Sequence, residues 1–477
     1  NPFFLLEMVQ LIAEKSSAAE VGPETIQALA LPQGVKDAIG RRLDALSPEC
    51  NTMLRAAAVI GRSFGIQRLE AMLDLPEEER SEATLELLAE ALDAGAIVEA
   101  EHGAYAFSHA LTRQTLYEEL RSPARIALHR RAGLALEQSL DPALGREEHA
   151  AELAHHFFEA APGGDVDKAV SCLEEAAVAA DRKYAYDEAV LFHERVLEAL
   201  ELRVHQDEER RSQALLSLGE AQFIAGRRDD AIGTLRSAAE LSRTVGRVDL
   251  LARSAIALRG HGELGSPPPE GVFELLQEAL EKLPEKELAL RARLTARLNG
   301  GRAQTMSGRM ELAERALELA EASGDPVALR DALGAKWWAT LGPDSVEERG
   351  VVGDALRQLA EQTNDPRTLL LALENEIGSG LIRGAREETE RSIDAFDGVA
   401  AQIRQPVFTF MGMQYRISWL IDRGRFEEAD RAADEARVEL LVHADVLEHE
   451  QREGGEDRVG RRRVTEPGEA AAGALEG

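Results

Sequence analysis

Three prolines recur at an interval of forty residues, at Pro326, Pro366 and Pro406. The first two stand in the triplets Gly324-Asp325-Pro326 and Asn364-Asp365-Pro366, in which an aspartate follows a residue type that often ends helices. An apolar stretch with helical spacing comes after these prolines. A fixed period of this length is typical of stacked helical repeats. Because such solenoids mostly hold other molecules along an extended surface, the sequence predicts binding or regulation rather than catalysis.

The repeat is clearest over residues 215–238, where large and small residues alternate across a helix hairpin. The spacing is that of tetratricopeptide repeats, and the residues that show it are Leu215, Leu218, Gly219, Ala231, Leu235 and Ala238. Small residues let two helices approach closely, and large residues fill the groove between them. A Gly-Arg pair also recurs at Gly226, Gly308 and Gly424, each time five residues before an alanine. We therefore expect a helix to end at each of these glycines.

The length of 477 residues exceeds a single compact core, so we expect two or more units. Charged residues make up 30% and aromatic residues 4%, and long tracts rich in alanine, leucine, glutamate and arginine predict an all-α protein. The net charge of −31 disfavours non-specific binding to nucleic acid. The two cysteines, Cys50 and Cys172, have neither metal-binding nor disulfide spacing, and no apolar run is long enough for a membrane span. We expect a cytoplasmic protein with no membrane partner.

Residues 31–125 combine helical segments with one hairpin. Ile97–Ala100 and Tyr105–Phe107 predict two short strands joined by a turn at His102-Gly103. Helices followed by a small hairpin are typical of a winged helix, a variant of the helix-turn-helix. The predicted fold is therefore all-α, with a winged-helix unit followed by a tetratricopeptide-like α-solenoid. Residues 33–120 carry eight Lys and Arg against sixteen Asp and Glu, so we expect this unit to pack on a neighbouring module rather than to bind DNA.

Six motifs follow one another in a fixed order along the chain. They are Asn1–Phe4, Leu31–Leu43, Arg55–Gly61, Phe107–Leu111, Ala151–Phe157 and Leu341–Asp344. Their order resembles the STAND class of AAA-type signal-transduction ATPases, which includes LuxR-type regulators and proteins joined to adenylate or guanylate cyclase domains. The resemblance covers roughly residues 1–440. It implies a nucleotide-driven switch, with an ATPase module ahead of Asn1, a winged helix that reads this module, and helical repeats that sense an unknown protein partner or a small inducer.

The predicted organisation combines this resemblance with the periodicity. We expect residues 1–30 to be the C-terminal end of a truncated ATPase module and residues 31–125 to form the winged-helix-like domain. Residues 126–260 are predicted to hold tetratricopeptide-like repeats, 261–271 a Pro/Gly-rich break, 272–441 a second set of helical repeats, and 442–477 a disordered tail. The chain has no initiator methionine, so we expect it to begin inside a longer protein.

The Walker A pattern of P-loop ATPases occurs nowhere in the chain. We therefore expect this chain not to be an enzyme and to hold no cofactor, with ATP and Mg²⁺ implied only for a full-length parent. The resemblance implies that Pro2 contacts the adenine ring in that parent, whereas Pro2 taken alone is an ordinary proline of a first helical turn. Two alternatives stay open: a fragment of a cyclase-linked ATPase enzyme, and a LuxR-type transcriptional activator without its helix-turn-helix.

Two groups of residues could suggest chemistry. His149, His155 and His156 lie near Glu152, but there is no H-E-x-x-H motif and His155 is expected to point away from His156, so we predict no metal site. Ser108 and His109 are neighbours, and neighbours in a strand point to opposite faces, so we predict no catalytic residue.

Six large aromatic side chains in the repeats are the candidates for binding a partner on a concave face. They are Tyr184, Tyr186, Phe223, Trp337, Trp338 and Trp419. For each of them the alternative is packing in the core between repeats.

Overall fold

The computed structural model describes residues 43–73, 75–76, 78, 80–140, 145–260, 268–299, 305–342 and 345–437. The predictions for residues 1–30, with Pro2, for most of the break at 261–271 and for the tail at 442–477 fall outside these residues. The chain divides into two compact units. One comprises Asn1–Arg182 with Phe192–Gln206, and the other comprises Lys183–Leu191 with Asp207–Gly477. No helix in the described part of the chain is both long enough and apolar enough to cross a bilayer.

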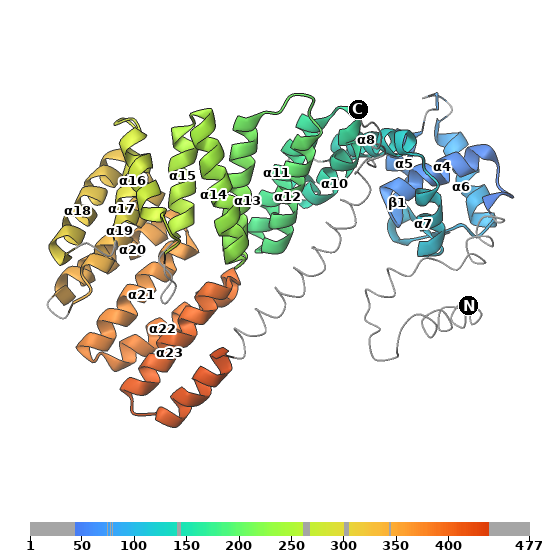
Figure 1. The fold of residues 1–477 in the computed structure, drawn as a ribbon. Helices are drawn as coiled ribbons and strands as arrows, with labels where there is room; N and C mark the ends of the chain where they lie inside the picture. The colour runs from blue at the N-terminus through green and yellow to red at the C-terminus, as the bar shows by residue number, and fades with distance from the viewer. Residues whose placement is uncertain are drawn as a thin grey trace, which may run out of the picture. The chain divides into compact units, whose positions relative to one another are not determined.

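The N-terminal unit contains helices and a small sheet (Figure 1). Its elements are α4 (Pro48–Ile60), β1 (Ser63–Gly65), α5 (Ile66–Met72), α6 (Arg80–Asp93), β2 (Ile97–Glu99), β3 (Ala104–Phe107), α7 (Ala110–Glu118), α8 (Ser122–Ser139), α9 (Gly145–Glu148), α10 (Ala150–Ala160) and α11 (Val166–Arg182). Helix α12 (Tyr186–Glu201) contributes to both units. The predicted hairpin is confirmed as β2 and β3.

The sheet has one strand that the sequence did not predict. The strand order is β1-β3-β2, and both pairings are antiparallel, with Phe64 opposite Tyr105 and Val98 opposite Ala106. Strand β1 has three residues, too few to show the alternation by which a strand is recognised. The strands pack on the helices through Phe64 and Phe107, whose rings lie 5.8 Å apart in the core of the unit.

The second unit is a tetratricopeptide-like stack of helix hairpins (Figure 1). The first helices of the hairpins are α13 (Glu208–Ile224), α15 (Val248–Arg259), α17 (Leu288–Leu298), α19 (Pro326–Ala339), α21 (Pro366–Arg383) and α23 (Pro406–Asp422). The second helices are α14 (Arg228–Val245), α16 (Val272–Lys282), α18 (Met306–Ser323), α20 (Val346–Thr363) and α22 (Arg386–Ile403), and residues 426–437 are also helical.

The forty-residue proline register marks the start of a hairpin. Pro326, Pro366 and Pro406 are each the first residue of a first helix, where the missing N–H leaves no hydrogen bond unmade. The preceding helix ends each time in a left-handed residue, at Gly324, Asn364 and Arg404. In two of the three turns an aspartate side chain then accepts backbone N–H groups of the new helix. The predicted repeat is confirmed.

The glycine turns are confirmed at two of three positions. Gly226 and Gly424 follow the ends of α13 and α23 with φ of 84° and 71°, a conformation that favours glycine. The prediction at Gly308 is wrong, because this residue is the third of α18. Thr305 caps that helix by accepting a hydrogen bond from the Gly308 amide over 3.2 Å. Helix α18 therefore begins before the Gly-Arg pair.

The stack is curved, because its two layers of helices pack differently. First helices contact one another from hairpin to hairpin, along α13, α15, α17, α19, α21 and α23. Second helices pack mainly against first helices. Helices on the inner side of a curved stack lie closer together than those on the outer side, so the first helices form the inner face of the repeat stack.

The close packing of the repeat predicts an effect for one glycine. A Cβ placed on Gly219 of α13 would lie 2.6 Å from Cγ of Leu235 in α14. We expect Gly219→Ala to lower the free energy of unfolding by about 1–2 kcal/mol, because overpacking outweighs the gain in helix propensity. Gly233→Ala is the control, since Gly233 is exposed and has no atom within 4 Å of its Cβ position. It should stabilise by about 0.5–1 kcal/mol. Urea unfolding followed by circular dichroism measures both, and equal effects would contradict the close approach.

Candidate functional site

The six aromatic candidates lie mostly inside the protein. Tyr186, Trp337 and Trp419 are buried, and Tyr184, Phe223 and Trp338 are half-buried. Trp337 packs in the core formed by α19, α20 and α21, and Trp419 packs in the core that includes α21 and α22. The rings of Trp337 and Trp338 meet edge to face with centroids 4.9 Å apart. Their positions fit core packing, and their role as partner contacts stays a prediction.

Tyr186 joins the two ends of the repeat stack. Its hydroxyl donates to the carbonyl of Ile403 over 2.8 Å and accepts from Nε2 of Gln405 over 3.2 Å. A Cβ placed on Gly226 would lie 3.6 Å from Pro406, so the turn after α13 also lies close to the start of α23. Burial raises the pKa of Tyr186, and the hydroxyl therefore stays protonated. We call this contact of Tyr186 with Ile403 and Gln405 the clasp.

A group of arginines surrounds one buried aspartate on the inner face of the repeat stack. Asp331 of α19 accepts from Arg293 over 3.0 Å, lies 3.3 Å from Arg297 and 3.2 Å from Arg330, and is only 1% exposed. Arg293 and Arg297 come from α17, four residues apart, and therefore share one face of that helix. We call Asp331 with these three arginines and the nearby Arg259 the arginine cluster.

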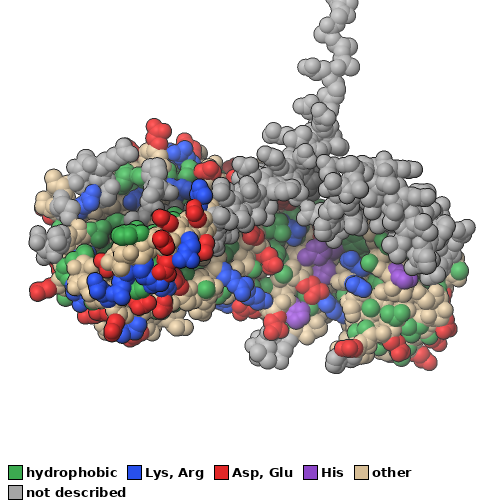
Figure 2. Space-filling view, turned by 90° about the horizontal axis from the view of Figure 1, so that it is seen from below, with side chains coloured by type: hydrophobic (Ala, Val, Ile, Leu, Met, Phe, Trp, Pro, Cys, Tyr) green, Lys and Arg blue, Asp and Glu red, His purple; other side chains and the backbone are tan. Residues whose placement is uncertain are grey.

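Like charges inside the arginine cluster act against one another. Burial lowers the pKa of Arg297, and Arg293, Arg330 and Arg259 lower it further, while Asp331 acts in the opposite direction. Burial, and then Arg228, lower the pKa of Arg259. Arginine nevertheless stays protonated in proteins, so the cluster keeps its positive charge. Figure 2 shows basic side chains, in blue, beside apolar ones, in green, on one face of the molecule.

The sequence alone did not single out the arginine cluster. A signal was present, because Arg293, Arg330 and Arg367 follow one another at an interval of 37 residues on α17, α19 and α21. The interval is close to the length of one hairpin but does not equal it, since these arginines are the sixth, fifth and second residues of their helices. Arginines are common in this chain, however, and the interval acquires meaning only once the inner face is known.

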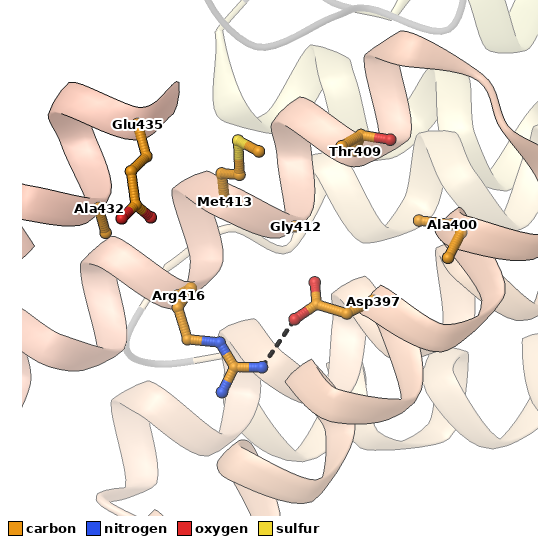
Figure 3. Close-up of a pocket in the computed structure, with 9 residues that line it drawn as sticks. Asp397, Ala400, Thr409, Gly412, Met413, Arg416, Ala432 and Glu435 are labelled. Carbon is orange, nitrogen blue, oxygen red and sulfur yellow. Dashed lines mark hydrogen bonds and ion pairs between the residues drawn. The ribbon is translucent and has the colours of Figure 1, made fainter. Parts of the chain in front are cut away.

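A cavity of about 280 Å³ lies beside α22, α23 and the helical residues 426–437 (Figure 3). Ala400, Gly412 and Met413 form much of its apolar lining. Its cation, Arg416, is already paired, since its guanidinium donates to Asp397 and to Asp394 over 2.7 Å each. None of the six aromatic candidates is among its lining residues.

Three histidines meet in the N-terminal unit. His129 of α8 shares a hydrogen bond of 3.0 Å between its Nδ1 and that of His156, and one of 2.8 Å between its Nε2 and the Tyr117 hydroxyl. The expectation that His155 diverges from His156 is wrong, because both rings lie 5.2 Å from the ring of His129. His149 instead precedes α10 at its N-cap position. The sequence did not predict His129, which lies 27 positions from His156.

This histidine cluster could hold a metal ion by proximity, since ligand atoms of all three residues lie within 4.8 Å of one another. Burial first, and then neighbouring charged groups, lower the pKa of His129 to about 3 and that of His155 to about 4. Both rings are therefore neutral at pH 7. The hydrogen bonds already account for one role of the cluster, which is to tie α7, α8 and α10 together.

Ser108 is hydrogen-bonded within the fold, and the two cysteines are buried. The Ser108 hydroxyl donates to the carbonyl of Gly95 over 2.7 Å, so it is engaged in closing the turn after α6. Cys50 and Cys172 are buried and free, and burial raises the pKa of their thiols to about 12 and about 11. Both thiols are therefore protonated at neutral pH and poor nucleophiles.

Comparisons with known proteins found solved structures of low similarity to this chain. No family model and no curated protein sequence matches the chain. Among solved structures, a STAND protein with a tetratricopeptide repeat sensor from Pyrococcus horikoshii is 12% identical with a TM-score of 0.35, over 93% of this chain and 68% of that one. A Rap protein complexed with competence and sporulation factor is 11% identical with a TM-score of 0.47, over 86% and 99%. Aspartyl phosphate phosphatase F from Bacillus subtilis is 12% identical with a TM-score of 0.43, over 83% and 95%. Because these TM-scores are below 0.5, the repeat architecture rests on the packing of the chain itself.

A buried acid predicts a pH dependence of stability. Burial raises the pKa of Glu374 in α21 to about 7, although the Tyr415 hydroxyl donates to its carboxyl group over 2.6 Å. The folded state therefore holds this proton more tightly than the unfolded chain, whose glutamates titrate near 4.5. The contribution of Glu374 to stability is greatest below pH 4.5 and is lost as pH rises through 7, and this loss amounts to roughly 2–3 kcal/mol.

The measurement is urea unfolding of the protein and of Glu374→Gln from pH 5 to pH 8. The variant keeps the size of the side chain and removes the titration, so its stability should fall by less over this range. Parallel curves for the two proteins would rule out a raised pKa at Glu374.

Proposed function

We propose that this chain is the regulatory and sensing arm of a STAND-type signal-transduction ATPase, and that it binds a protein partner or a small inducer on the inner face of its repeats. The observation that carries the proposal is the curvature of the repeat stack, in which successive first helices contact one another and form that face. Curved repeat proteins use such faces to hold extended partners. In this proposal the chain binds the ligand and transmits its bound state, and the ATPase module of the parent protein carries out the chemistry.

The N-terminal unit supports the proposed place of this arm in the parent. Its elements run helix, strand, two helices and two strands, from α4 to β3, and the first strand pairs with the last in the order β1-β3-β2. This order fits a winged helix, in which a hairpin follows a helix-turn-helix. The acidic balance of residues 33–120 favours packing on the ATPase module over binding to DNA.

The clasp is a contact that can open and close, as a switch between two conformations requires. Two hydrogen bonds from one side chain join residues 217 and 219 positions apart, and such a contact can open without unfolding the cores on either side. A ligand shifts the balance between closed and open arrangements only if it binds them with different affinity. A ligand on the inner face meets this condition, because opening the clasp changes the spacing of the first helices.

The test is the affinity of the full chain for the polypeptide encoded immediately upstream of Asn1, measured with ATP, with ADP and without nucleotide. We expect that polypeptide to contain a P-loop, and we expect the affinities in ATP and ADP to differ by about tenfold, which is typical of coupled sites.

Tyr186→Phe should change this ratio, since it removes the hydroxyl of the clasp and keeps the ring. Arg315→Gln, on the exposed surface of α18 and away from the clasp, is the control. An upstream polypeptide without a P-loop, or equal affinities in the two nucleotide states, would refute the proposed function.

A further inference from the structure

Among the described residues, the arginine cluster carries more positive charge than the acids in contact with it balance. Arg259 of α15, Arg293 and Arg297 of α17 and Arg330 of α19 come from three successive first helices. The acid facing Arg297 is Asp331, whose carboxylate is shared by three guanidinium groups. A second acid, Asp365, lies 3.4 Å from Arg330 but also caps α21 with its side chain.

This excess is held away from water. The side chains of Arg297, Arg330 and Arg293 are 12%, 13% and 25% exposed. Buried charge is strongly unfavourable unless it is paired and hydrogen-bonded, and arginine cannot relieve the strain by losing its proton. Within the described residues, Nε of Arg259 and Nε of Arg297 have no hydrogen-bond partner. The cluster therefore has donors and charge left over for an anion.

The place of the cluster leaves one of its arginines open to a ligand. It lies on first helices, which form the inner face of the repeat stack, and Arg293 keeps a quarter of its side chain in solvent. Guanidinium groups present a planar fork of N–H donors that matches the oxygens of a carboxylate or a phosphate. An incoming oxyanion would complete hydrogen bonds that Asp331 alone cannot make for several arginines at once.

We propose that the arginine cluster is the binding site for an oxyanion group, a carboxylate or a phosphate, of the ligand that the repeats sense. The site deepens the proposed function and rests on it for its biological meaning, since it names the chemistry of the sensed ligand. Arg259, Arg293 and Arg297 hold the anion, and Asp331 keeps the arginines in place when the site is empty.

Replacing an arginine of the cluster and replacing Asp331 should have opposite effects on anion binding and on the stability of the free chain. Arg297→Gln should weaken anion binding at least tenfold while leaving the stability of the free chain equal or higher, because it removes one of several repelling charges. Asp331→Asn should lower the stability of the free chain and tighten anion binding, because it removes the competing carboxylate. A purely structural ion network would instead lose stability in both variants.

The experiment is isothermal titration of the full chain at low salt with two probes, pyrophosphate and a hexaglutamate peptide. Saturable binding of pyrophosphate alone indicates a small phosphate ligand, and tighter binding of hexaglutamate indicates an acidic peptide. Sodium chloride at the same ionic strength is the control for screening. Arg315→Gln is the matched control variant, since Arg315 lies on α18, is 63% exposed and pairs with Glu318.

Circular dichroism first checks that each variant is folded, and Arg293→Gln replaces Arg297→Gln if the latter unfolds. The proposal is overturned if neither probe binds above the chloride control, or if Arg315→Gln weakens binding as much as the cluster variants do. Nucleotide-dependent binding of the upstream polypeptide would then still stand, so failure of the anion site and failure of the proposed function are separate results.

Discussion

Close approach between helices at small residues is the constraint on which the repeat stack depends. The core shared by α17, α18 and α19 consists of buried alanines, including Ala292, Ala313 and Ala332. Glycines serve the same purpose elsewhere, as where Gly219 faces Leu235. With so little side-chain volume between them, successive first helices come into contact and the stack curves. Curvature in turn gathers the long side chains of the first helices on one inner face, where arginines from three hairpins meet.

The sequence predicted the features that depend on local chemistry. A proline at the start of a helix, an aspartate that caps it and a left-handed residue just before it are all neighbours in the chain, so the hairpin register at Pro326 and Pro366 was readable. The hairpin of β2 and β3 was readable for the same reason. Gly308 was misread because glycine occurs both at turns and within the first turn of a helix, and only the cap at Thr305 distinguishes the two.

The features that depend on how successive hairpins pack could not be predicted from the sequence. The clasp joins residues 217 positions apart, and their contact follows from curvature accumulated over several hairpins. Asp331 and Arg293 are 38 positions apart, and they meet only because α17 and α19 pack side by side. His129 and His156 meet because α8 packs on α10. In each case the residue types were visible, but the distance between them was a property of packing.

The chain as a whole is acidic, whereas the arginine cluster is basic. Together these two charges determine which ligands suit the inner face. A net charge of −31 repels anions at long range, yet at physiological salt that repulsion is screened beyond about 8 Å. Attraction by the arginine cluster acts over shorter distances and is stronger, because the site is partly shielded from water. A polyanion such as nucleic acid must bring much of its charge against the acidic surface, whereas a ligand with one or two anionic groups need not. The inner face is therefore suited to a ligand whose negative charge is concentrated at one point.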